Sequence, residues 1–201
     1  MRLNNKTNMT NKFQNKYRIP SARLQNWDYG SNAAYFVTIC TQNRECFLGD
    51  ILDGIMELSE IGEMAEKYWL EIPNHFPFVK LDAFVVMPNH VHGIIIIDKP
   101  DDDTANVETQ NFASLPTNTK NKPKNKFGPQ SKNLASIIRG FKIGVTKNAR
   151  QIHADFAWQS RFHDHIIRDD KSYQNISEYI INNPLKWTDD KFNPSKMNTA
   201  E

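Results

Sequence analysis

The most apolar part of the chain is residues 81–97, where two runs of β-branched and aromatic residues flank a short Met-Pro-Asn breaker. Runs of this kind are typical of buried strands, and a Pro-Asn pair between them is typical of a tight turn. The pattern therefore predicts two neighbouring strands, with His90 and His92 at the start of the second strand.

Apolar residues at strand or helix spacing predict further elements on both sides of these strands. The expected elements are a strand over residues 34–41, a short return strand or extended segment over 45–49, a helix over 56–72, a helix over 133–151, strand-like residues 156–167, and a helix from about 171 to 183 that Pro184 ends. This order, with tight turns between strands, predicts an α+β fold in which helices pack on one face of a mainly antiparallel sheet.

Three polar segments lack apolar periodicity and set the expected domain boundaries. Residues 1–32 are expected to form a basic N-terminal arm, residues 98–132 a long flexible loop, and residues 189–201 a polar tail. We expect the chain to fray from Lys186 onward. A chain of 201 residues suits one domain with extensions, and we place that domain at residues 33–188.

Composition bears on the exposed share of the chain, the redox compartment and any association with a membrane. Hydrophobic residues make up 39% of the chain and the mean hydropathy is −0.64, so part of the chain is expected to be exposed loop or tail. The two cysteines, Cys40 and Cys46, form no CxxC pair, which leaves a thiolate metal site unsupported and fits a reducing cytoplasm. The sequence contains neither an apolar stretch of membrane-spanning length nor a signal-peptide pattern. We therefore expect a soluble, cytoplasmic protein without a membrane partner.

Charge is distributed unevenly along the chain. The net charge is only +2, but the first 27 residues carry lysines and arginines and no acidic residue. A basic arm of this kind suits a polyanion partner, and a solvated arm without a partner is the alternative. The same two interpretations apply to the lysine-rich second half of the predicted loop, which could hold phosphates or simply be hydrated.

His90 and His92 are candidate metal ligands. Side chains alternate along a strand, so the two imidazoles point to one face while Val91 points to the other. Two imidazoles side by side are half of a divalent-metal site, and burying both costs free energy unless each finds a partner. Ordinary packing of the histidines in the core is the alternative. Gly93, which has no side chain, leaves room for a close approach.

The last predicted helix presents a second pair of functional groups. Tyr179 and Asn183 are four residues apart and therefore lie on one helix face. An amide carbonyl is a hard oxygen ligand for Mg²⁺ or Mn²⁺, and a tyrosine hydroxyl is a nucleophile suited to reactions that keep a covalent intermediate. Core packing for Tyr179 and a helix cap for Asn183 are the structural alternatives.

Three segments of the chain resemble a known family. They are residues 35–41 (YFVTICT), 86–93 (VMPNHVHG) and 178–184 (EYIINNP). With a His-Val-His string in a strand and Tyr179 followed four residues later by Asn183, the chain resembles the single-tyrosine transposases of the HUH nuclease superfamily. More narrowly, it resembles the REP-associated tyrosine transposases. The resemblance covers roughly residues 17–188.

The resemblance implies a ferredoxin-like palm with the histidines on a central strand and a C-terminal catalytic helix packed against it. It implies a Mg²⁺ or Mn²⁺ ion held by His90 and His92, with Asn183 as a third ligand. The implied nucleophile is Tyr179. Many family members carry Gln four residues after the tyrosine, so the reach of the shorter Asn side chain needs a test. Tyr173 is expected to be structural, and relatives include both monomers and homodimers.

The implied activity is that of a metal-dependent endonuclease and strand transferase, which acts on single-stranded DNA through a 5′-phosphotyrosine intermediate. The substrate would be hairpin or repeat DNA. We expect basic residues of the arm and of the 133–151 helix to hold its phosphates. The candidates are Arg18, Arg23, Arg139 and Lys142. Trp27 and Tyr29 are aromatic candidates for base stacking, with packing as their alternative role.

Three other functions compete with this interpretation. Ferredoxin-like sheets also serve as base-stacking platforms, so the chain could be a non-enzymatic module that binds single-stranded nucleic acid. A zinc hydrolase would need a third protein ligand of nitrogen, sulfur or carboxylate type near the histidine pair, such as His163 or His165. A rolling-circle initiator or relaxase would share the chemistry of a tyrosine transposase and differ in its biological role.

Overall fold

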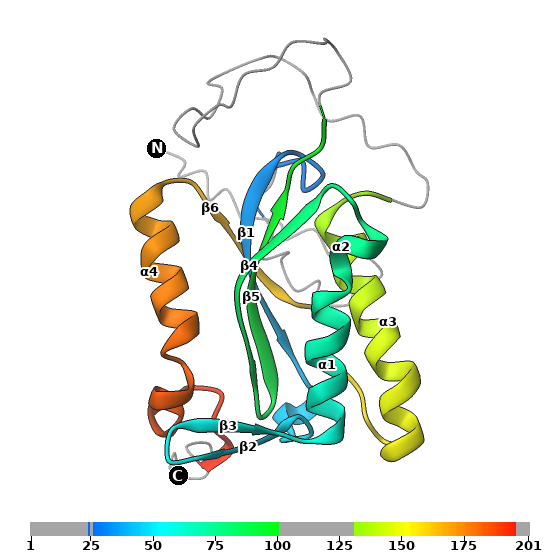
Figure 1. The fold of residues 1–201 in the computed structure, drawn as a ribbon, viewed down its shortest axis with the longest axis vertical. Coiled ribbons are helices and arrows are strands. Elements are labelled where there is room, and N and C mark those ends of the chain that lie inside the picture. Colours follow the sequence, from blue (N-terminus) through cyan, green and yellow to red (C-terminus); the bar gives the residue numbers. More distant parts are fainter. Residues whose placement is uncertain (1–23, 25, 101–130, 196–201) are drawn as a thin grey trace, which may run out of the picture.

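The computed structural model describes residues 24, 26–100 and 131–195, and a four-stranded antiparallel sheet forms its centre (Figure 1). The strands are β1 (Ala33–Cys40), β4 (Val79–Met87), β5 (His90–Ile97) and β6 (His163–Ile167). Their order is β4-β5-β1-β6, and all neighbouring pairs are antiparallel. Helical crossovers join β1 to β4 and β5 to β6, and this arrangement is a ferredoxin-like palm. The predicted α+β fold is confirmed.

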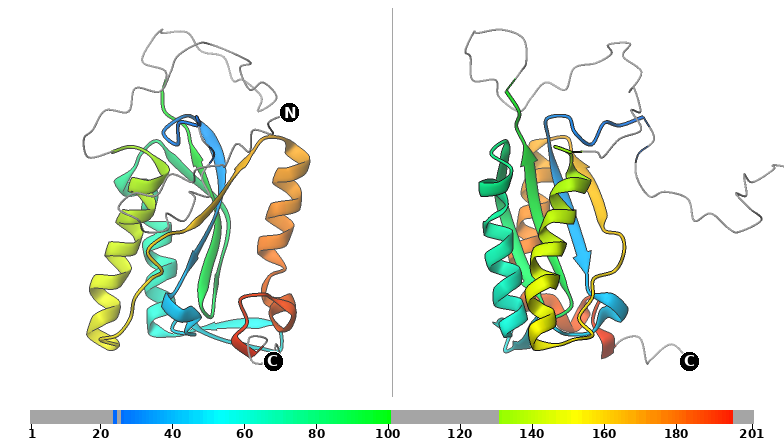
Figure 2. Two further views of the ribbon diagram at one scale, coloured as in Figure 1. Left: turned by 180° about the vertical axis from the view of Figure 1, so that it is seen from behind. Right: turned by 90° about the vertical axis from the view of Figure 1, so that its right-hand side faces the viewer.

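Helices cover both faces of the sheet (Figures 1 and 2). One face carries α1 (Glu60–Leu70), the single turn α2 (Ile72–His75) and α3 (Leu134–Ile152), and the other carries α4 (Asp170–Ile181). The three long helices begin at capping side chains, Ser59, Asn133 and Asp169, each of which accepts a backbone N–H of the first turn. The helices predicted over residues 133–151 and 171–183 are present as α3 and α4, with small shifts at their ends.

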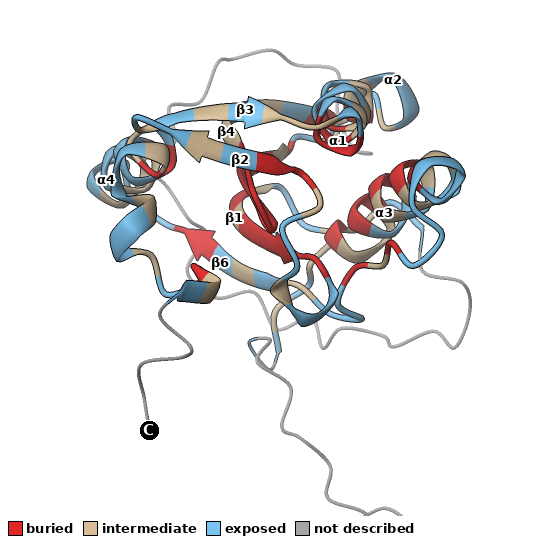
Figure 3. Ribbon diagram, turned by 90° about the horizontal axis from the view of Figure 1, so that it is seen from below, coloured by how far each residue is buried: buried red, intermediate tan, exposed pale blue. Residues whose placement is uncertain are grey.

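The alternation of side chains along β5 divides the core between the two helical layers. Val91 belongs to the larger cluster beneath α1 and α3, which also contains Trp69. Ile94 belongs to a smaller cluster with Ile180 of α4. Figure 3 shows the buried residues concentrated on the strands and on the inward sides of α1 and α3. The even-numbered positions of β5, which include both histidines, are thus left for the α4 face.

A short hairpin at one end of the palm was not predicted. Its strands are β2 (Gly49–Leu52) and β3 (Ile55–Leu58). The turn residues Asp53 and Gly54 have positive φ angles of 51° and 78°, and positive φ at both positions is the turn geometry that an Asp-Gly pair favours in hairpins. The helix predicted over residues 56–72 is therefore wrong in its first turn, and the return strand predicted over residues 45–49 lies further along the chain.

The strand-like segment predicted over residues 156–167 is also shorter than expected. Only its C-terminal part forms β6, and upstream of it Trp158 makes an isolated bridge with Thr41. Two 3-10 helices lie at the hairpin end of the palm. They are η1 (Gln42–Arg44) and η2 (Pro184–Asp189).

Most of the predicted arm and loop lies outside the described residues. In the described part of the arm, Trp27 Nε1 donates to the Tyr35 hydroxyl at 3.1 Å, and the Tyr29 ring stacks on Tyr35 with centroids 5.9 Å apart. These contacts favour packing over base stacking for both aromatic residues. Within residues 24, 26–100 and 131–195, no helix has both the length and the apolar character needed to cross a membrane.

Gly93 is required by the packing of the palm. A Cβ atom at this position would lie 2.2 Å from Trp69 Cζ2, an indole that is fully buried under the sheet. We predict that Gly93→Ala lowers the free energy of unfolding by about 1–3 kcal/mol, because Trp69 has no space to move into. Urea denaturation measures this change.

Gly140 provides a matched control, since a Cβ there would meet nothing closer than Phe76 Cε2 at 3.6 Å. Gly140→Ala in an exposed helix position is expected to raise stability by up to ~1 kcal/mol. Equal destabilisation by both substitutions would contradict the packing account.

Candidate active site

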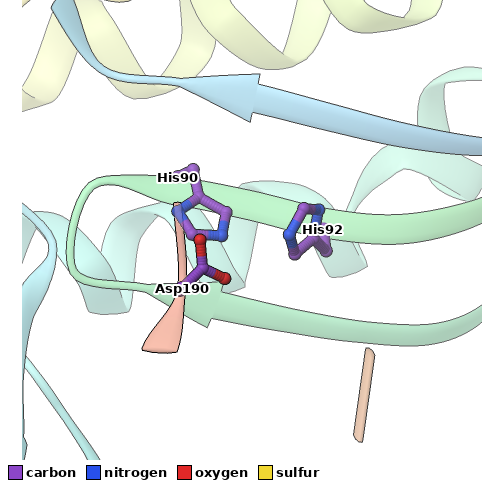
Figure 4. A group of neighbouring side chains, drawn as sticks. All are labelled: His90, His92 and Asp190. Carbon is purple, nitrogen blue, oxygen red and sulfur yellow. The ribbon is translucent and has the colours of Figure 1, made fainter. Parts of the chain in front are cut away.

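His90 and His92 are buried side by side on the sheet face that α4 covers. Their exposed fractions are 0% and 2%, and their ring centroids lie 4.4 Å apart. Figure 4 shows both rings projecting from the same side of β5. The local sequence explains this placement, because the Pro88-Asn89 turn starts β5 at the first histidine and residues two apart share a face.

The four ring nitrogens of His90 and His92 have different hydrogen-bond partners. His92 Nδ1 lies 2.9 Å from Thr38 Oγ1 on β1, and its Nε2 lies 3.3 Å from the Tyr179 hydroxyl on α4. His90 Nδ1 lies 2.8 Å from Asn89 Oδ1. The buried His90 Nε2 has no hydrogen-bond partner among the described residues. The Nδ1 atom of each ring is thus held by a side chain of the palm, while the Nε2 atoms face the Tyr179 hydroxyl in His92 and no described group in His90.

Burial keeps both imidazoles uncharged. It lowers the pKa of His90 well below the ordinary value, and the neighbouring His92 lowers it further. Burial likewise lowers the pKa of His92 to about 3, with a smaller contribution from the positive charge of Lys191. A neutral imidazole has one nitrogen with a free lone pair, which is the form that binds metals. Both rings are therefore in the metal-binding state at neutral pH.

Tyr179 meets the histidines from α4, and Asn183, which follows the end of α4, contacts Tyr179. The Tyr179 ring lies over His92 with centroids 5.3 Å apart, and its side chain remains 39% exposed. Burial raises the pKa of the Tyr179 hydroxyl and the Asp190 carboxylate raises it further, whereas a hydrogen bond with the Asn183 side chain lowers it. Asn183 is 2% exposed, and its Oδ1 has no hydrogen-bond partner among the described residues. The predicted pairing of the tyrosine with the histidines is thus present in the fold.

The segment after η2 adds a carboxylate that the sequence analysis missed. Asp190 lies beside the histidine pair, and the ligand atoms of the three side chains are within 4.8 Å of one another (Figure 4). The prediction that the chain frays from Lys186 is wrong for the described residues up to 195. Arg44 Nη1 donates to the Lys191 carbonyl oxygen at 2.8 Å, and the Phe192 ring packs on His90 with centroids 4.6 Å apart.

These groups fit a divalent cation. The set combines two neutral imidazoles with the Asp190 carboxylate, and mixed nitrogen and oxygen ligands of this kind bind divalent metal ions. A buried polar atom without a partner costs about 1–3 kcal/mol, and a cation at the histidine pair would remove this cost for His90 Nε2. In the described part of the chain, the ligand group at the pair contains neither His163 nor His165. Asp190 supplies a third ligand of the carboxylate type instead, so the zinc hydrolase stays an alternative on the ligand set alone.

Other predicted residues lie away from the histidines. Arg139 and Lys142 are on α3, which covers the opposite face of the sheet. Lys142 Nζ donates to the carbonyl oxygens of Gln159 and Arg161, and burial lowers the pKa of its amine to about 8. Arg18 and Arg23 lie outside the described residues. Contact between DNA and these four residues stays a prediction.

Tyr173 has the structural role that was expected of it. Its hydroxyl donates a hydrogen bond to the Asp82 carboxylate of β4. This contact anchors the first half of α4 to the edge of the sheet. It also raises the pKa of Tyr173, in addition to the larger effect of burial.

Buried neutral histidines make stability depend on pH. In the unfolded chain both histidines take up a proton near pH 6.5. In the folded chain His92 does so only near pH 3, and His90 also only far below 6.5. The stability that the pair contributes is therefore complete above pH 6.5 and is lost as pH falls toward the folded pKa. We predict a loss of at most about 1.4 kcal/mol per pH unit for each histidine, measured by urea denaturation between pH 7 and 4.

A control separates this effect from general acid unfolding. The H90Q/H92Q double variant should show a shallower dependence of stability on pH, while a substitution of the exposed His75 by Gln should leave the dependence unchanged. The same pH slope in the double variant and in the native chain would contradict the assignment.

Comparison with known proteins places the chain in a family. No family model matches the chain. An uncharacterized protein of Haemophilus influenzae is 42% identical over 173 residues, which cover 85% of this chain and 91% of the relative. A second protein of the same organism, named "Putative REP-associated tyrosine transposase", is 30% identical over 160 residues, which cover 79% of this chain and 74% of the relative.

A solved structure agrees with this relationship at the level of the fold. A REP-associated tyrosine transposase bound to a REP hairpin matches with a TM-score of 0.53 and 22% sequence identity, over 84% of this chain and 74% of that chain. The second Haemophilus relative extends the likeness to the sequence over most of both chains. The chain therefore belongs to the family of REP-associated tyrosine transposases.

Proposed function

We propose that this protein is a metal-dependent single-stranded DNA endonuclease and strand transferase with Tyr179 as its nucleophile. One observation carries the proposal: the Tyr179 hydroxyl lies 3.3 Å from Nε2 of the buried, uncharged His92, although the two residues are 87 positions apart in the chain. Membership of a tyrosine transposase family supports the reaction class.

Four side chains are proposed to hold Mg²⁺ or Mn²⁺. They are His90, His92, Asp190 and Asn183. When bound, such an ion would withdraw charge from a non-bridging oxygen of the scissile phosphate. His90 Nε2 and Asn183 Oδ1 support this assignment, because both are buried atoms for which the described residues offer no hydrogen-bond partner.

Tyr179 is proposed to perform the covalent step. Its hydroxyl oxygen attacks phosphorus and forms a 5′-phosphotyrosine, while the bond from phosphorus to the 3′ oxygen breaks. The phenolic proton leaves to solvent, and the departing 3′ oxygen takes up a proton to become a hydroxyl. Since the phosphodiester energy is kept in the tyrosine ester, attack by another 3′-hydroxyl reverses the step and joins two strands without ATP.

The surroundings of Tyr179 give DNA access to its hydroxyl but, in the absence of a bound cation, disfavour the phenolate. Its exposed fraction of 39% lets a DNA backbone reach the hydroxyl from solvent. Burial and the Asp190 charge raise the pKa of the phenol, which disfavours the phenolate in the absence of other charges, while the hydrogen bond with Asn183 opposes this effect. Positive charge next to the phenol would lower its pKa toward the working range.

The proposed substrate is hairpin or repeat DNA. The related transposase of known structure is bound to a REP hairpin, and we extend this substrate class to the present chain as part of the proposal. The alternative of a non-enzymatic binding module is less well supported. Such a platform stacks bases on aromatic residues of an open sheet face, whereas here α4 and a buried histidine pair occupy part of that face.

The test is formation of a covalent protein–DNA adduct. Incubation with a single-stranded hairpin oligonucleotide and Mn²⁺, followed by a denaturing gel, should show the adduct for the native chain. We predict that Tyr179→Phe lowers its yield by at least about a thousandfold, since the nucleophilic oxygen is removed. Binding of the oligonucleotide should stay within a factor of about two, because the phenol ring is retained.

Tyr173→Phe is the matched control, as it removes a hydroxyl from the same helix at a position that contacts Asp82 instead of His92. This variant should form the adduct. An adduct that survives in Tyr179→Phe, or one that disappears equally in both variants, would remove Tyr179 from the proposed role.

A further inference from the structure

We propose that Asn89 is a positioning residue that assembles the metal site. Its side-chain oxygen sets which nitrogen of His90 carries the proton, and its side-chain nitrogen holds the C-terminal segment that carries Asp190. This inference rests on the metal site of the proposed function. It concerns the assembly of that site and is independent of the covalent step.

The orientation of the Asn89 amide follows from its partners. Its Nδ2 donates to the carbonyl oxygen of Arg44 at 2.9 Å and to the carbonyl oxygen of Phe192 at 2.8 Å. Backbone carbonyls only accept hydrogen bonds, so the group that faces them must be the NH₂. The amide oxygen therefore faces His90 Nδ1, at 2.8 Å. A flipped amide would place an oxygen against two carbonyl oxygens and is excluded.

The fixed amide determines the tautomer of His90. An amide oxygen can only accept, so the proton of the neutral imidazole must be on Nδ1. His90 Nε2 then carries a lone pair, and this is the buried nitrogen that has no hydrogen-bond partner among the described residues. Hydrogen bonding of the second ring nitrogen is a general way in which proteins orient a metal-binding histidine. Asn89 thus presents His90 as a ligand before any ion is bound.

The backbone holds Asn89 in place. The residue is fully buried, and its carbonyl oxygen accepts from the backbone N–H of Thr41 at 2.9 Å and from Thr41 Oγ1 at 3.0 Å. The main chain at Asn89 is therefore fixed, and the side chain extends from this fixed position just before β5. A small displacement of this amide would break contacts with His90 and Phe192 at once.

The same amide ties the C-terminal segment to the palm. Phe192, which accepts from Asn89, is two residues from Asp190 and packs on His90. Arg44 reinforces this tie, since its guanidinium donates to the Lys191 carbonyl oxygen and lies 4.9 Å from the centre of the Phe192 ring. These contacts place the Asp190 carboxylate beside the histidines. One side chain therefore serves two ligands of the proposed ion.

Two substitutions separate these functions. Asn89→Asp keeps an acceptor for His90 Nδ1 but turns a carboxylate oxygen toward the carbonyls of Arg44 and Phe192. It should preserve the His90 tautomer and release the C-terminal segment. Asn89→Leu keeps the branched shape and the number of side-chain heavy atoms but has no polar atom, so it should lose both effects. Asn148→Leu on α3 is the control, because it removes an amide that donates to Tyr68 and Gly144 far from the histidines.

The experiment uses the full chain without DNA and has three readouts. Long-range ¹H–¹⁵N spectra of the imidazoles report the tautomer of His90 in the absence of metal. Limited trypsin digestion with mass spectrometry reports whether cleavage after Lys191 becomes faster. Calorimetric titration with MnCl₂ reports metal affinity. For Asn89→Leu we expect affinity to fall about 10–100-fold, with a mixed His90 tautomer and faster cleavage. The control should match the native chain in all three readouts.

Specific results would overturn the proposal. A His90 ring protonated on Nε2 in the native chain would do so without any variant, so the test survives even if Asn89→Leu fails to fold. The proposal would also be overturned if a folded Asn89→Leu bound Mn²⁺ with native affinity, or if trypsin cleavage were unchanged in Asn89→Asp. None of these readouts depends on DNA cleavage. Failure of the Tyr179 adduct with intact Mn²⁺ binding would instead count against the proposed function alone.

Discussion

The burial of two uncharged imidazoles in one strand is the constraint on which the rest of this structure depends. A charged imidazole in this position would lose most of its hydration, so burial holds both rings neutral and leaves a lone pair on each. His92 finds partners on β1 and α4, while His90 Nε2 is left without one among the described residues. An arrangement that is costly for stability alone is well suited to binding a cation.

The palm tolerates the free-energy cost of burying the two histidines because its two faces differ in their apolar packing. The face beneath α1 and α3 holds the larger apolar cluster, including Trp69 against Gly93, and makes the sheet rigid. The α4 face holds a smaller apolar cluster around Ile94 and Ile180. The polar groups of the site lie at one end of this smaller cluster, where the C-terminal segment meets the sheet. A rigid sheet fixes the relative positions of the imidazoles, and α4 adds the phenol.

The sequence predicted those parts of the site that depend on local periodicity. The alternation of β5 placed both histidines on one face, and the four-residue spacing placed Tyr179 with Asn183. Asp190 was missed, because main-chain carbonyls at Lys191 and Phe192 hold its segment and such contacts leave no side-chain pattern. The β2–β3 hairpin was missed for another reason. Its Asp-Gly turn is a recognised signal, but apolar residues at helical spacing just downstream favoured a helix that began too early.

Anomalous diffraction from crystals grown with MnCl₂ shows whether the histidine pair binds a metal ion, since it locates the ion without reference to activity. We expect one strong manganese peak bonded to Nε2 of both His90 and His92, next to the Tyr179 hydroxyl and with an oxygen ligand from Asp190 or Asn183. Saturated crystals with no peak at the histidine pair, or with manganese bound only at a site that lacks both imidazoles, would contradict this expectation.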